Sequence, residues 1–306
     1  MRHIKVMLEY FHPWTNSAGF YYAREQGWYR EIRLEIDFVC YDPYRGDTLS
    51  YLYRNEVDFG IFPTNRLFVY REKSPIVKGI AAINHTGMEA IQTIKSTEIK
   101  RPADLSGKRI AMNPSPRGLA MVKYLIEQDG GKPEFEVVNA GYRELEAIDL
   151  ANGVADATFG SYWAWELQLH STIPHDERII WPVDSIGAPK YHSYLLGTQE
   201  KLINQDPELI RQFLEVTERG FLAVAKEPLI AASIYEKIIP YFPSYLVECS
   251  LPLIAPTWLN NGQWGEQREE IMKEYSDWLV RYQILDDPDG WKTAYTNHLL
   301  PKRSIV

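Results

Sequence analysis

The stretch IKVMLEYFHPWTNSAGFYYAREQGWYRE, residues 4–31, contains the two patterns on which the fold of this chain depends. Its first eight residues form a mostly apolar run, which predicts a buried β-strand. The segment 17–31 has apolar residues at helical spacing and contains Gly27, a residue type that commonly ends a helix. This stretch therefore predicts a strand, a loop and a helix in direct succession.

The same alternation continues along the chain. Strands are predicted at 32–41 and 76–84, a helix at 47–56, and a short strand, polar turn and helix within 57–73. A second series of alternating strands and helices begins near residue 89. From residue 193 onward, helices dominate. Alternating strands and helices are typical of α/β proteins with largely parallel sheets. The two successive series predict an α/β chain of two lobes.

Composition excludes several classes of function. The formal net charge is −8 and the basic residues are scattered, so the chain lacks the patch that nucleic acid binding requires. Cys40 and Cys249 lie far apart and give neither a disulfide framework nor a zinc spacing. No apolar run nears the ~20 residues of a membrane-spanning helix. Aromatic residues make up 13% of the chain, which suits a pocket for a flat ligand. We expect no metal and no cofactor.

Five segments resemble a known family. They are WTNSAGFYYAREQGWYRE (14–31), NEVDFGIFPTN (55–65), IKRPADLSGKRIAMNPSP (99–116), GVADATFGSYWAWE (153–166) and GWKTAYTNHLLP (290–301). In order and spacing they resemble the type-2 periplasmic binding proteins of ABC importers, in the branch for thiamine-pyrimidine precursors, nitrate, taurine and alkanesulfonates. The YW-x-WE run and the opening W-T-N look most similar to proteins that bind an aminopyrimidine.

This resemblance implies a two-lobed fold in which each lobe is a βα sheet flanked by helices. Residues 1–86 together with 196–306 would form the first lobe, and residues 87–195 an inserted second lobe. The ligand would lie in a cleft between the lobes, which close over it by a hinge motion. Such proteins are usually monomers, and we expect the same here.

Two loops of the first lobe carry candidate ligand-binding residues. Trp14 and Asn16 directly follow the first strand, where an indole can stack on a planar heterocycle and an amide can pair with its nitrogen edge. Packing and helix capping are the structural alternative. Tyr21, on the next helix, fits binding and core equally well. Thr64 and Asn65 open a helix, where they can cap it or direct a backbone donor at a ligand.

In the second lobe, the loop NPSPRGLAM (113–121) joins a strand to a helix. Ser115 and Gly118 leave N–H groups free at the helix start, which attracts a carboxylate, sulfonate or phosphate, and Arg117 can add charge. The same residues also make an ordinary helix N-terminus with Pro116 in the first turn. Ligand contact and simple capping are both open.

The run SYWAWE (161–166) supplies the second aromatic candidate. Tyr162 and Trp163 can form an opposing stacking wall, and Glu166 can accept hydrogen bonds from the amino group and ring nitrogen of an aminopyrimidine. An exposed helix glutamate is the alternative for Glu166. His85 and His192 lie near the inferred crossings between the lobes and are further candidates for ligand contact.

The favoured function is a substrate-binding protein that captures a small planar heterocycle, foremost a thiamine-related aminopyrimidine, and presents it to an ABC permease. The alternatives are a cytosolic enzyme of the same fold, similar to pyrimidine-precursor synthases or to decarboxylases and desulfinases, and a cytosolic ligand sensor. The turn FPTNRL lacks the histidine of the related synthases, and the CCCFC run is absent, which counts against an enzyme. The location would be extracytoplasmic if an export segment has been removed, and cytoplasmic if Met1 is the native start.

Overall fold

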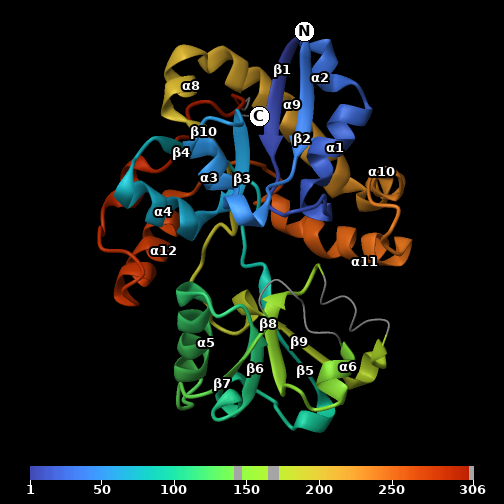
Figure 1. Cartoon of the computed structure of the whole chain (residues 1–306), viewed down its shortest axis with the longest axis vertical. Coiled ribbons are helices and arrows are strands. Elements are labelled where there is room, and N and C mark those ends of the chain that lie inside the picture. Colours follow the sequence, from blue (N-terminus) through green and yellow to red (C-terminus); the bar gives the residue numbers. More distant parts are fainter. Residues whose placement is uncertain (141–146, 165–171, 303–306) are drawn as a thin grey trace. The chain divides into compact units, whose positions relative to one another are not determined.

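The computed structural model describes residues 1–140, 147–164 and 172–302. The chain divides into two compact units: Met1–Thr86 together with Tyr191–Val306, and Gly87–Lys190. Each unit contains one five-stranded sheet flanked by helices (Figure 1). The prediction of an α/β fold with a separate sheet in each lobe is therefore confirmed.

The sheet of the first unit has the strand order β2-β1-β3-β10-β4. Its strands are β1 (Arg2–Met7), β2 (Leu34–Val39), β3 (Phe59–Pro63), β4 (Val77–Ala82) and β10 (Tyr194–Gln199). β1 pairs in parallel with β2 and β3, whereas β10 is antiparallel to both β3 and β4. The sheet is therefore mixed, because the chain returns as β10 between two strands that run the other way.

Helices gather on both sides of this sheet (Figure 1). They are α1 (Ala18–Glu25), α2 (Trp28–Glu31), α3 (Thr48–Tyr53), α4 (Thr64–Lys73), α8 (Glu200–Gln205), α9 (Pro207–Lys226), α10 (Ala232–Ile238), α11 (Ser244–Ile254) and α12 (Glu269–Arg281). α1 and α9 pack closely, since a Cβ on Gly220 would lie 2.2 Å from the carbonyl oxygen of Gly19. Gly27 has a φ of +76° and separates α1 from α2.

The second unit has the strand order β7-β6-β8-β5-β9. Its strands are β5 (Glu89–Ile94), β6 (Arg109–Met112), β7 (Glu136–Asn139), β8 (Ala157–Ser161) and β9 (Arg178–Pro182), with helices α5 (Pro116–Gln128) and α6 (Ala147–Ala151). β6 is parallel to β7 and β8, and β5 is antiparallel to β8 and β9. Figure 1 shows α5 and α6 flanking this sheet at opposite sides of the view.

The chain returns to the first unit earlier than predicted. The expected boundary lay between residues 195 and 196, but the second unit ends at Lys190. Tyr191 stacks on Tyr275 of α12 with ring centroids 4.7 Å apart, and the carbonyl of Tyr194 accepts from Ile83 N at 2.9 Å. The Ser193 hydroxyl donates to the Thr86 carbonyl at 2.7 Å, so the outgoing and returning segments are tied together. These contacts place residues 191–195 in the first unit.

Within the described ranges, we find no helix that combines the length and apolar character needed to span a membrane.

Candidate functional site

A buried carboxyl group lies just beyond the carboxyl end of β1. Glu9 is only 7% exposed, and its Oε2 accepts a hydrogen bond from the Ser17 hydroxyl at 3.0 Å. Its Oε1 is also buried and has no hydrogen-bond partner among the described residues. Burial raises the pKa of Glu9 to about 7, and the hydrogen bond from Ser17 offsets only part of that effect. Glu9 can therefore be neutral or charged near physiological pH.

Sequence reasoning missed Glu9. The apolar run that contains Glu9, residues 4–11, predicts a strand and gives no separate indication of a buried polar side chain. The available signal was a single acidic residue at the carboxyl end of a buried strand, followed within five residues by three aromatic residues, Tyr10, Phe11 and Trp14. Polar groups at that end of a strand are favourably placed for binding in α/β folds.

Asn16 is fully buried and forms a network with two distant segments. Its Oδ1 accepts from Asn84 Nδ2 at 2.9 Å and from Trp258 Nε1 at 3.0 Å, and its Nδ2 donates to Asn84 Oδ1 at 3.2 Å. Asn84 also donates to Thr257 Oγ1 at 2.8 Å. In this conformation the Asn16 amide thus makes its hydrogen bonds to the chain itself, and it fixes the loop after β1 against the end of β4.

Trp14 and Tyr21 belong to a buried aromatic group near Glu9. The Trp14 carbonyl accepts from the Tyr235 hydroxyl at 2.7 Å, and its indole lies 5.1 Å from the Phe242 ring. Tyr21 packs edge-on against Phe38 and Tyr235, at 4.8 and 5.7 Å. Both side chains are almost fully buried. The predicted pair Trp14 and Asn16 therefore comes together in the structure, next to Glu9 rather than on an open surface.

A second group of predicted residues surrounds a histidine pair. The rings of His85 and His192 lie 5.2 Å apart in an edge-on contact, and Thr64 Oγ1 donates to the His192 carbonyl at 2.5 Å. His192 Nε2 accepts from the backbone N–H of Arg268 at 3.1 Å. Burial, His85 and Arg268 all hold the pKa of His192 well below its usual range, so this ring is neutral. Asn65 is half-buried in the first turn of α4.

In the second unit, the start of α5 is capped by the chain itself. Ser115 Oγ accepts from Gly118 N at 3.1 Å, and Pro116 occupies the first turn. The Arg117 guanidinium is largely buried and forms an ion pair with Glu89 at the start of β5. The capping interpretation of Ser115 is thus what the structure displays, while Arg117 supplies a buried charge on this unit.

Tyr162 and Trp163 follow β8 but occupy different surroundings. Trp163 is fully buried within the second unit, whereas Tyr162 is half-buried. Burial, followed by the charges of Asp184 and Glu89, raises the pKa of the Tyr162 hydroxyl. Asp184 in turn accepts from Gly87 N, with Oδ2 at 3.0 Å and Oδ1 at 3.2 Å. Glu166 lies outside the described residues, so its predicted role has no structural counterpart here.

Among the residues that the structure describes, no group of three or more His, Cys, Asp and Glu side chains could hold a metal ion. Cys40 is half-buried and Cys249 is exposed, and both are free thiols.

Comparison with known proteins connects this geometry to a family. The family described as NMT1/THI5 like matches residues 14–231. A formylaminopyrimidine-binding protein of Halalkalibacterium halodurans is 24% identical over 301 residues, which cover 96% of this chain and 89% of that protein.

Solved structures of similar fold include two that cover nearly the whole chain. The alkanesulfonate-binding protein SsuA from Xanthomonas axonopodis pv. citri, bound to MOPS, has a TM-score of 0.67 and 13% identity, covering 96% of this chain and 98% of its own. A Candida albicans protein described as having the generic periplasmic binding protein fold has a TM-score of 0.64 and 16% identity, covering 100% and 99%. The chain therefore has the periplasmic binding protein fold.

Proposed function

This chain belongs to the NMT1/THI5-like family, and we propose that it is the substrate-binding protein of an ABC importer for a small planar heterocycle, foremost a thiamine-related aminopyrimidine. The name of its Halalkalibacterium relative and the sulfonate-binding neighbours of its fold support a binding role over catalysis. The importer's permease would be its partner, which implies work outside the cytoplasm.

The observation that carries the ligand class is the Glu9 carboxyl. A 4-aminopyrimidine presents an N–H donor beside a ring-nitrogen acceptor. A neutral carboxyl group matches that edge, because its O–H donates to the ring nitrogen while its C=O accepts from the amino group. The pKa near 7 keeps this form accessible, and Oε1 is the atom without a partner. Binding would displace the side chains that cover Oε1.

The aromatic group beside Glu9 supports the same ligand class. Tyr21 lies close enough for the Glu9 charge to act on its hydroxyl, and Trp14 follows Glu9 by five residues in the same loop. A flat heterocycle gains both area and stacking from such side chains. Tyr162 of the second unit is the corresponding candidate for an opposing wall. We propose that the two lobes close over the ligand so that both sets of residues contact it, with Arg117, Thr64, Asn65 and the two histidines completing the site.

A small anion such as an alkanesulfonate is the second candidate, favoured by one observation. Arg268 Nε is buried without a hydrogen-bond partner among the described residues, and its cation acts on His192 next to Thr64. An anionic oxygen would satisfy that donor. This alternative uses the histidine pair rather than Glu9.

Isothermal titration with three ligands separates the candidates. We expect formylaminopyrimidine to bind, the same ring without its amino group to bind at least tenfold more weakly, and an alkanesulfonate not to compete. Glu9→Met should weaken aminopyrimidine binding by about 10- to 100-fold, because it removes both hydrogen bonds, whereas Glu9→Gln keeps a donor beside an acceptor and should bind nearly normally. Glu248→Met, on the exposed side of α11, is the control and should bind normally. Tight sulfonate binding with no effect of Glu9→Met would favour the anion candidate instead.

A further inference from the structure

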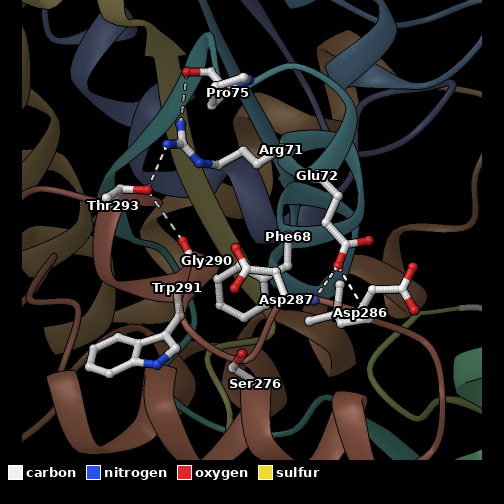
Figure 2. Close-up of a pocket in the computed structure, with 11 residues that line it drawn as sticks. Phe68, Arg71, Glu72, Pro75, Ser276, Asp286, Asp287, Gly290, Trp291 and Thr293 are labelled. Atoms are coloured by element: carbon white, nitrogen blue, oxygen red, sulfur yellow. Dashed lines mark hydrogen bonds between the residues drawn. The ribbon is translucent and has the colours of Figure 1, made fainter.

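A separate cavity of about 490 Å³ opens in the first unit between α4, α12 and the segment that follows α12 (Figure 2). We call it the α4–α12 pocket and define it by Phe68, Glu72, Ser276, Leu285, Asp287 and Trp291. It lies toward the C-terminal half of α4, whereas Thr64 begins that helix. Its volume is within the range of small-molecule sites.

The floor of the pocket is apolar except for one hydroxyl group. Phe68, Leu285 and Trp291 are each at most 5% exposed. Ser276 is fully buried on α12, and its Oγ has no hydrogen-bond partner in the described part of the chain. Figure 2 shows that hydroxyl directed from α12 toward the Phe68 ring. Leaving a buried hydroxyl unpaired is unfavourable, so a ligand atom that pairs with it strengthens binding.

Three carboxylates stand at the rim: Glu72, Asp286 and Asp287 (Figure 2). Glu72 is held in place because its Oε1 accepts from the backbone N–H groups of Asp286 and Asp287 at 2.7 and 2.9 Å. Fixing one oxygen this way leaves Oε2 for a ligand. The three negative charges lie on two short segments, which makes the mouth of the pocket attractive to a cation.

The one basic side chain in the described lining, Arg71, does not offset these charges. Arg71 is buried, with 8% of the residue exposed. Its guanidinium donates hydrogen bonds to Val77 O at 2.5 Å and to Thr293 Oγ1 at 3.0 Å. It also forms an ion pair with Glu200 at 3.3 Å. Its acidic partner is thus Glu200, which also pairs with Lys78 at 3.4 Å, and not a rim carboxylate. The nearby Lys292 pairs with Asp289 at 2.7 Å. The rim carboxylates keep a net negative field.

We propose that the α4–α12 pocket binds a small organic cation that carries an apolar or aromatic body. Its ammonium group would be held by the Glu72 and Asp287 carboxylates, its body would lie on Phe68 and Leu285, and a polar atom would pair with Ser276 Oγ. A simple anion would be repelled by the rim carboxylates, and an uncharged hydrocarbon would leave those carboxylates and Ser276 Oγ without a partner. This site is independent of Glu9 and of the proposed importer ligand.

Benzylammonium, benzyl alcohol and benzoate test the charge requirement, because they share one ring and differ in charge. Titration of the full chain, followed by calorimetry and ligand-observed NMR, should show benzylammonium binding at one site per chain. Benzyl alcohol should bind at least tenfold more weakly, and benzoate should not bind. Raising the salt concentration should weaken benzylammonium binding, since rim charges are screened. The proposal would be overturned if benzyl alcohol bound as tightly as benzylammonium. It would also be overturned if benzylammonium binding did not saturate at about 10 mM.

Variants locate the binding. Asp287→Asn should weaken benzylammonium binding severalfold or more, and Asp277→Asn, which faces solvent on α12 and pairs with Lys273, should leave it unchanged. Ser276→Ala should leave benzylammonium binding unchanged but weaken the binding of 4-hydroxybenzylammonium severalfold, because the ring hydroxyl of that probe can pair with Ser276 Oγ. Ser276→Ala should not lower the melting temperature, because it removes an unpaired buried hydroxyl. All three variants should bind formylaminopyrimidine as the unaltered chain does. Unchanged benzylammonium binding in Asp287→Asn, or unchanged 4-hydroxybenzylammonium binding in Ser276→Ala, would contradict the site without bearing on the importer function.

Discussion

The indole Nε1 of Trp258 donates a 3.0 Å hydrogen bond to Oδ1 of Asn16, across a sequence separation of 242 residues. Asn84, at the end of β4, donates to the same oxygen at 2.9 Å. One buried amide therefore joins the loop after β1, the end of β4 and the turn that follows α11. Asn16 is both a candidate ligand contact and a structural connector, and the two roles predict different effects of its replacement.

We expect Asn16→Ala to destabilise the fold by about 2–4 kcal/mol, because it leaves the Trp258 and Asn84 donors buried and unpaired. Urea unfolding monitored by tryptophan fluorescence measures the change. Trp258→Phe removes one donor together with its need for an acceptor and should cost less than Asn16→Ala. A normal stability of Asn16→Ala combined with lost ligand binding would instead identify Asn16 as a ligand contact.

Glu9 makes stability depend on pH in an unusual direction. Its folded-state pKa of about 7 exceeds the usual value of 4.5, so the folded chain binds the proton more tightly than the unfolded chain does. Stability should therefore fall as the pH rises from about 4.5 to 7, by roughly 3 kcal/mol at most. Glu9→Gln should remove that decline, whereas Glu248→Gln should retain it, as measured by urea unfolding at pH 5 and pH 8. A decline of equal size in Glu9→Gln would show that another group is responsible.

His192 acts in the opposite sense. Its folded-state pKa lies well below 6.5, so the unfolded chain takes up the proton first. The contribution of neutral His192 to the free energy of unfolding is fully present above pH 6.5 and is lost as the pH falls below that value. His192→Gln keeps an acceptor for Arg268 N and should flatten the loss of stability between pH 6.5 and 5. His298→Gln, at an exposed position, is the matched control and should leave the acid limb unchanged.

The contact of α1 with α9 admits no side chain at Gly220. A Cβ there would meet the carbonyl oxygen of Gly19 at 2.2 Å, and that oxygen belongs to the backbone of α1. Gly220→Ala should therefore cost at least 1–3 kcal/mol despite the helix propensity gained, since the two helices must separate. Glu215→Ala, exposed on the same helix, should change stability by less than about 0.5 kcal/mol. A Gly220→Ala chain as stable as the original would mean that α1 can shift without loss.

The sequence predicted the α/β fold and its two sheets because alternation of strands and helices is a local pattern. It did not predict that β10 enters its sheet antiparallel between β3 and β4, since local periodicity carries no information about which strands pair. The early return at Lys190 follows from the same pairing, which assigns Tyr194 to the first sheet. Strand order is a property of contacts distant in sequence.

The candidate site was accessible only in part. Trp14, Asn16 and Tyr21 were singled out because they follow a strand, and the structure gathers them near one another. Glu9 escaped notice because one acidic residue in an apolar run resembles a solvent-facing strand position. Its burial depends on rings such as Tyr21 and Tyr235, which come from segments more than 200 residues apart. The assignments to ligand contact stay predictions.

The hydrogen bond from Ser193 to the Thr86 carbonyl has a consequence for how the protein can be rebuilt. It holds Thr86 and Ser193 next to each other in the first unit. The inserted segment from Gly87 to Lys190 therefore begins and ends at neighbouring points. Such a segment can be exchanged for that of a relative, or replaced by a short linker, without rerouting β3 or β4. Ligand preference could then be recombined between relatives one lobe at a time.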